Sequence, residues 1–132
     1  MSIVGFIGLG IMGKPMAMNL LKAGVKLLVN DIDQKTVDCL VTEGATQSQL
    51  SELGTNCEVI FTNLPSGSIV HNVLFGENGL AQTIKKGAVV CDLSSVTPME
   101  SQTCYKKLKE LGVAFLDAPV SGGEPKAPWQ MV

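Results

Sequence analysis

The sequence predicts an α/β fold, a doubly wound and mostly parallel sheet with helices on both faces. Short apolar runs alternate with helical patterns along the chain, and glycines repeatedly mark where a helical pattern ends. Strands separated by helices need crossover connections, which are right-handed and give parallel pairing. The 132 residues amount to one domain, and the 45% hydrophobic share is enough for a buried core.

The first half of the chain is expected to form two strand–helix units and a shorter third one. An apolar run leads into a glycine turn, and apolar side chains at helical spacing follow it. Gly24 and Gly44 lie where a helix end favours glycine. The expected strands are residues 3–7 and 26–30, with a possible short one near 45–46, and the expected helices are 12–22, 34–43 and 48–53.

The second half repeats the alternation. β-branched residues such as Val59 and Ile60 favour a strand, and Pro98 suits the first position of a helix that Thr97 or Ser95 would cap. The expected strands are residues 58–62, 88–91 and 113–116, and the expected helices are 66–75, 79–84 and 98 to about 111.

The turn after the first strand has the glycine spacing of a dinucleotide-binding turn, with glycines at positions 8, 10 and 13. Gly8 would let the backbone turn sharply, Gly10 would leave room for a pyrophosphate, and Gly13 would let the helix lie close to the strand. The free N–H groups of the helix start would bind the phosphates. The candidate phosphate-binding residues are Gly8, Leu9, Gly10, Ile11, Met12 and Gly13.

An acidic residue follows at the distance expected for a ribose ligand. Asp31 lies after the second strand, about twenty residues beyond the turn, and Asn30 beside it is also a candidate cofactor-binding residue. Its carboxylate would accept hydrogen bonds from the ribose hydroxyls and repel a 2′-phosphate, which favours NAD over NADP. Two alternatives stay open: Asp31 is a surface or helix-capping residue, with Asp33 nearby, and Lys35 leaves room for NADP.

The other predicted strand ends also carry polar and turn-forming residues, and ligands bind beyond the carboxyl ends of such strands. Leu64 and Pro65 would form an apolar wall beside the cofactor; alternatively, they belong to a simple loop that contacts no ligand. Ser94 and Ser95 would contact cofactor or substrate, or serve as turn and capping residues. The loop Ser121-Gly122-Gly123 offers a hydroxyl and backbone N–H groups that suit a carboxylate; the alternative is a flexible loop without a ligand.

Composition excludes several other function classes. A net charge of −2 gives no electrostatic case for nucleic acid or an anionic membrane, and we expect neither partner. No targeting or membrane segment is visible, so we expect a cytoplasmic protein. The four cysteines and the single histidine form neither a metal site nor a nucleophilic constellation, and the cysteines are expected to be reduced: Cys39, Cys57, Cys91, Cys104 and His71.

Several motifs in order resemble the β-hydroxyacid dehydrogenases, the family of 3-hydroxyisobutyrate dehydrogenase and 2-hydroxy-3-oxopropionate (tartronate semialdehyde) reductase. The resemblance begins at Phe6-Ile7-Gly8-Leu9-Gly10-Ile11-Met12-Gly13 and continues through Leu64-Pro65 and Asp92-Leu93-Ser94-Ser95. It ends with Asp117-Ala118-Pro119-Val120-Ser121-Gly122-Gly123 and covers nearly the whole chain to Ala127.

The resemblance implies an oxidoreductase that passes a hydride between NAD or NADP and a small β-hydroxyacid or semialdehyde. It implies that Leu64, Pro65 and Ser95 line the nicotinamide side and that the loop 121–123 binds the substrate carboxylate. Position 95 is often threonine in the family, and serine keeps its hydroxyl. Full-length members are expected to form homo-oligomers.

The family's helical second domain and its catalytic lysine are absent from this sequence, so no residue is assigned a catalytic role. Residues 1–127 are expected to be the dinucleotide-binding domain, and 128–132 an atypical truncated tail. We expect the chain alone to bind cofactor and turn over little. The alternatives are a non-catalytic dinucleotide-binding module and a reductase of glyoxylate or succinic semialdehyde. The sequence leaves the substrate and reaction direction open.

Overall fold

The computed structural model describes residues 3–94 and 96–118. Strands and helices alternate along this part of the chain, with a single 3₁₀ turn, η1. In chain order the elements are β1 Ile3–Ile7, α1 Gly10–Lys22, β2 Lys26–Asn30, α2 Gln34–Thr42, β3 Thr46–Gln47, α3 Leu50–Asn56, β4 Val59–Thr62, α4 Gly67–Phe75, η1 Leu80–Gln82, β5 Val89–Asp92, α5 Pro98–Glu110 and β6 Ala114–Asp117.

The six strands form one sheet in the order β3-β2-β1-β4-β5-β6. All its pairings are parallel. The chain builds outward from β1 to β3 and then returns to the other side of β1 to place β4. This reversal puts a topological switch point between β1 and β4, where ligands bind in such sheets. The predicted doubly wound fold is confirmed.

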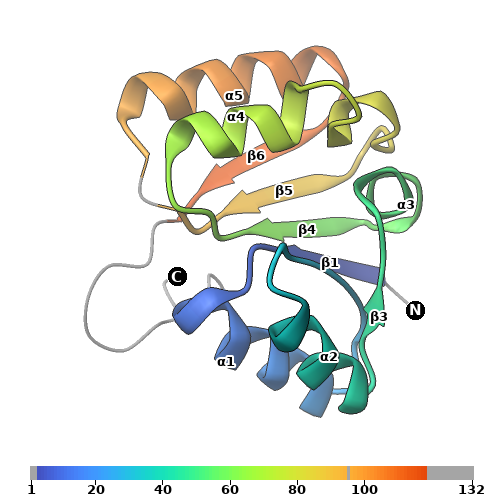
Figure 1. Cartoon of the computed structure of the whole chain (residues 1–132). Coiled ribbons are helices and arrows are strands. Elements are labelled where there is room, and N and C mark those ends of the chain that lie inside the picture. Colours follow the sequence, from blue (N-terminus) through green and yellow to red (C-terminus); the bar gives the residue numbers. More distant parts are fainter. Residues whose placement is uncertain (1–2, 95, 119–132) are drawn as a thin grey trace.

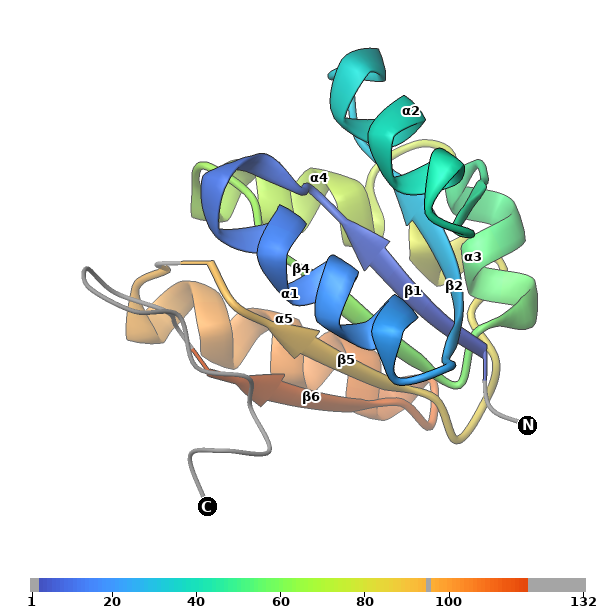
Figure 2. The same cartoon turned by 90° about the horizontal axis from the view of Figure 1, so that it is seen from below.

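Helices cover both faces of the sheet. Figure 1 shows α4 and α5 on one side and α1 and α2 on the other, and Figure 2 shows α1 lying along the sheet beside β1. Neighbouring residues on a strand therefore enter different cores. Phe6 and Phe61 pack under α1, with ring centroids 5.6 Å apart, whereas Ile7 and Ile60 pack with α3, α4 and α5.

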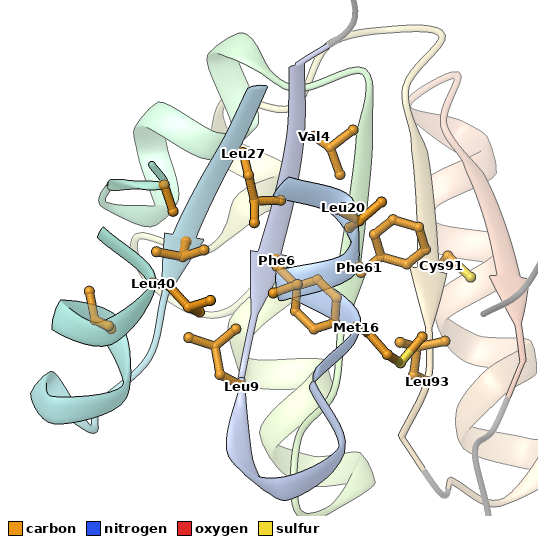
Figure 3. Close-up of a cluster of buried hydrophobic side chains, with 14 residues drawn as sticks. Val4, Phe6, Leu9, Met16, Leu20, Leu27, Leu40, Phe61, Cys91 and Leu93 are labelled. Carbon is orange, nitrogen blue, oxygen red and sulfur yellow. The ribbon is translucent and has the colours of Figure 1, made fainter. Parts of the chain in front are cut away.

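The core under α1 and α2 consists of aliphatic, methionine and phenylalanine side chains. Leu9 and Met16 pack against Phe6, and Leu93 closes the cluster from the end of β5 (Figure 3). Leu9 is fully buried. Its side chain therefore anchors the glycine turn in the core and leaves only its backbone for a ligand.

Some predicted boundaries were wrong by a few residues. Helix α1 begins at Gly10 rather than at residue 12, because the glycine turn runs directly into helical backbone. Helix α3 spans Leu50–Asn56 rather than 48–53, because Gln49 precedes it and donates its N–H to Glu52 at 3.1 Å. Residues 79–84 form only a short 3₁₀ turn.

Candidate functional site

A crevice of about 290 Å³ lies at the carboxyl ends of β1, β2 and β4, beside the switch point. Its wall combines the glycine turn, the end of β2 and the loop that leads into α4. The lining residues are Ile7, Gly8, Leu9, Asn30, Asp31, Ile32, Asn63, Leu64, Pro65, Ile69 and Val73. Apolar side chains predominate, and a few polar groups converge on the crevice, as in sites for organic ligands.

Gly8 and Gly13 allow the turn to pack tightly. Gly8 has φ +80°, and a Cβ there would lie 2.3 Å from the backbone oxygen of Asn63. A Cβ on Gly13 would lie 2.8 Å from the backbone oxygen of Gly8 and 3.1 Å from the Phe6 ring. Glycine at these positions therefore brings α1 close to β1 and brings the turn close to the end of β4.

The start of α1 has no capping side chain at its N-cap, Leu9. By contrast, Asp33, Ser66 and Thr97 accept hydrogen bonds at the starts of α2, α4 and α5. The first-turn N–H groups of α1 therefore lack the side-chain acceptor that these other helices have. Such groups, at the positive end of a helix dipole, bind phosphate well.

Asp31 faces the glycine turn. Its Oδ2 accepts the N–H of Leu9 at 2.5 Å, and its Oδ1 accepts the N–H of Asp33 at 3.0 Å. Asp33 is the cap of α2 and accepts from Lys35 N–H at 3.1 Å and from the Thr36 hydroxyl at 2.9 Å. Of the two neighbouring acids, Asp33 therefore caps the helix, and Asp31 carries its charge into the crevice.

Asn30 lines the crevice, but its side chain is used elsewhere. Its Nδ2 donates to the backbone oxygen of Ser48 at 2.8 Å, which ties the end of β2 to the end of β3. Its backbone oxygen accepts the N–H of Gly8 at 2.9 Å. The structure thus shows Asn30 supporting the shape of the turn.

Leu64 and Pro65 belong to the same crevice as Gly8 and Asp31. The N–H of Leu64 donates to Oγ of Ser94 at 2.7 Å. Ser94 is only 2% exposed, so its hydroxyl is used inside the protein. Ser95 and the loop 121–123 lie outside the described residues, as do residues 128–132.

Sequence reasoning missed several crevice residues. Ile32 is fully exposed directly after Asp31, and Ile69 and Val73 face the crevice from α4. The sequence did contain a signal for Ile32, because an apolar residue directly after the acid at the end of β2 could have been predicted to line the crevice. Ile69 and Val73, four residues apart on one helix face, became recognisable only once α4 was placed against β4.

The part of the chain that the structure describes contains no group of three or more histidine, cysteine, aspartate or glutamate residues suited to a metal ion. His71 lies on α4 away from the crevice, with Nε2 2.9 Å from Nζ of Lys107 on α5. The four cysteines are unpaired, and all except Cys39 are buried. None of the described helices is long and apolar enough to cross a membrane.

The strand order, the glycine turn at the switch point and the acid at the end of β2 define a dinucleotide-binding domain of the Rossmann type. The family model for the NAD binding domain of 6-phosphogluconate dehydrogenase matches residues 3–130 of the chain. Together with the relatives described next, this match shows that the chain belongs to the β-hydroxyacid dehydrogenase family and is its NAD(P)-binding domain.

Two curated relatives and one solved structure illustrate the family. The chain is 44% identical to 2-hydroxy-3-oxopropionate reductase of Escherichia coli, over 92% of this chain and 41% of that protein. It is 42% identical to 2-(hydroxymethyl)glutarate dehydrogenase of Eubacterium barkeri, over 91% of this chain and 40% of the relative. A crystal structure of 3-hydroxyisobutyrate dehydrogenase from Salmonella typhimurium matches with a TM-score of 0.86 and 30% identity, over 93% of this chain and 43% of that chain. The chain therefore spans about 40% of the length of its curated relatives.

Proposed function

We propose that this chain supplies the cofactor-binding part of an NAD-dependent dehydrogenase for a small β-hydroxyacid or the corresponding semialdehyde. The bound nicotinamide cofactor supplies hydride transfer to or from the substrate carbon. The residues of this chain bind and orient that cofactor. The observation that carries the proposal is the position of Asp31, whose carboxylate lines the crevice and accepts a hydrogen bond from the glycine turn.

The proposal assigns a role to each part of the crevice. The N–H groups that begin α1 bind the pyrophosphate. Asp31 accepts the adenosine ribose hydroxyls, because a carboxylate oxygen has lone pairs left beyond the bonds to Leu9 and Asp33. Ile32 and Ile69 offer apolar surface to the adenine ring. A negative charge at this position disfavours the 2′-phosphate of NADP, so NAD is the proposed cofactor.

The substrate side of the proposal rests on sequence alone. Ser95 lines the nicotinamide side, and the loop Ser121-Gly122-Gly123 binds the substrate carboxylate through backbone N–H groups and a hydroxyl. The relatives named above act on different acids, so the proposal extends to the class of small β-hydroxyacids and their semialdehydes. The 132-residue chain spans about 40% of the length of its curated relatives, and we expect this part by itself to bind cofactor without appreciable turnover.

Titration calorimetry with NAD and NADP tests the cofactor assignment. Replacement of Asp31 by alanine removes two charge-assisted hydrogen bonds and should weaken NAD binding by about 10- to 100-fold. The same change should improve NADP relative to NAD, because the repelling charge is gone. Glu110→Ala is the matched control, since it removes an exposed carboxylate at the end of α5, far from the crevice. An unchanged NAD affinity in Asp31→Ala would show that the ribose assignment is wrong.

Steady-state assays with 3-hydroxyisobutyrate, D-glycerate and tartronate semialdehyde test the expectation about turnover. Cofactor binding without turnover by the 132-residue chain supports it. Full turnover by this chain alone contradicts it.

A further inference from the structure

A buried carboxyl group lies next to the crevice without lining it. Asp92 is the last residue of β5, and its register partner on β4 is Thr62. Both residues are fully buried. Oδ1 of Asp92 accepts the Thr62 hydroxyl at 2.8 Å and the N–H of Ser94 at 3.1 Å. Oδ2 has no hydrogen-bond partner within residues 3–94 and 96–118.

The hydrogen bonds continue from Asp92 to the crevice wall. Ser94, whose N–H is held by Asp92, accepts the N–H of Leu64 on its own hydroxyl oxygen at 2.7 Å. Leu64 lines the crevice. The carboxyl group therefore links the end of β5 to the loop that follows β4, in the order Asp92, Ser94, Leu64.

The burial of this carboxyl group does not serve the stability of the fold well. Burial raises the pKa of Asp92, and the nearby Asp117 on β6 raises it further. Burial raises the pKa of the Cys104 thiol on α5, and the charge of Asp92 raises it further. The one ion pair among the described residues, Lys85 with Glu58, does not involve this carboxyl. A buried acid without a cation is costly, and an apolar residue of similar volume is often at least as stable.

We propose that Asp92 is a positioning residue of the cofactor crevice, which fixes the backbone at Leu64 through Ser94. The proposal rests on the proposed cofactor site for its effect on affinity, but the effect on the Leu64 backbone is independent of that function. The Thr62 hydroxyl holds Oδ1 of Asp92 in place, and the same oxygen accepts the N–H of Ser94. The hydroxyl of Ser94 then accepts the N–H of Leu64 and fixes where the loop leaves β4. A wall held at a fixed distance from Asp31 lowers the ordering cost of binding.

Three variants separate positioning from a general effect on folding. Asp92→Ala removes the acceptor, whereas Asp92→Asn keeps an oxygen in the place of Oδ1. Val90→Ala is the matched control, because Val90 is buried on the same strand and face but has an apolar side chain that takes no part in the hydrogen bonds from Asp92 to Leu64. The two readouts are amide hydrogen exchange at Leu64, measured without ligand, and the Kd for NAD, measured by calorimetry on the folded protein.

In Asp92→Ala we expect the exchange protection of Leu64 to fall more than the global protection, and the Kd for NAD to rise about tenfold, the effect of one hydrogen bond. Asp92→Asn should restore both readouts to within about twofold of the wild type. Val90→Ala should lower the melting temperature and leave the Kd unchanged. If Asp92→Ala does not fold, Ser94→Ala breaks the same link while Asp92 keeps its bond to Thr62, and the same results are expected.

Equal loss of protection across the whole sheet in Asp92→Ala and Ser94→Ala, with an unchanged Kd, would overturn the proposal and leave Asp92 a purely structural residue. If the wild type does not bind NAD, the proposed function fails. The exchange measurement then still decides the role of Asp92, because it needs no ligand.

Discussion

Replacement of Gly8 by alanine tests how closely the glycine turn packs against the end of β4. Gly8 has φ +80°, and Gly24, just after α1, has φ +85°. An alanine at either position meets the same left-handed strain, about 1–2 kcal/mol. The surroundings differ, because a Cβ on Gly24 meets nothing within 4 Å, whereas one on Gly8 lies 2.3 Å from the backbone oxygen of Asn63. Gly24→Ala is therefore a matched control for backbone strain.

The clash at Gly8 involves backbone, which cannot rotate away as a side chain would, so an overpacking cost of about 1–3 kcal/mol is added. Gly8→Ala should thus lose roughly 2–5 kcal/mol in free energy of unfolding, against about 1–2 kcal/mol for Gly24→Ala. In urea, with a slope of about 2 kcal/mol per molar, the two midpoints should differ by roughly 1 M. Equal midpoints would refute the argument, because they would mean that the turn does not touch β4 closely.

Two further predictions concern buried ionisable groups. Because the pKa of Asp92 is raised in the folded protein, ionisation of this carboxyl group opposes folding. The contribution of Asp92 to the free energy of unfolding is therefore greatest below the unfolded pKa of about 4, and it is lost as the pH rises through the higher folded pKa. The unfolding free energy of the wild type relative to Asp92→Asn should therefore fall with rising pH from about 4 upward, measured by urea titration, and a pH-independent difference would contradict this. Burial also raises the pKa of the Cys57 thiol to about 12 and those of Cys91 and Cys104 to about 11, so at pH 8 a thiol reagent should label the exposed Cys39 quickly and the other three only after denaturation. Rapid labelling of more than one thiol in the native protein would show that the cores open.

The local sequence was sufficient to predict the strands of the sheet. The apolar runs of β1 and β2 agree with the structure at both ends, because glycines or polar residues delimit them on each side. The start of α3 was predicted less accurately, because it depends on a reciprocal hydrogen bond between Gln49 and Glu52. The turn at η1 was overestimated because three to six residues of helical composition do not by themselves make a stable helix.

Proximity at the site was predictable, but the direction of a side chain was not. The sequence placed Asp31 and Asp33 near one crevice but left open which of them caps α2, and only the backbone direction at the end of β2 decides that. The side-chain amide of Asn30, a candidate cofactor-binding residue, donates to the backbone oxygen of Ser48 on the neighbouring connection, a partner that the sequence did not predict. Asp92 received no role because its partner, Thr62, lies thirty residues away in the chain.

The uncapped start of α1 has a consequence for the abundance of the protein. Part of the free energy that a capping side chain would contribute, about 1 kcal/mol, is left for a bound anion to provide. A ligand that binds only the folded chain adds about 2.7 kcal/mol of stability at a hundred times its Kd. The fraction of chains open to proteolysis would then depend on how much dinucleotide the cell contains, so that a shortage of cofactor shortens the lifetime of the protein that uses it.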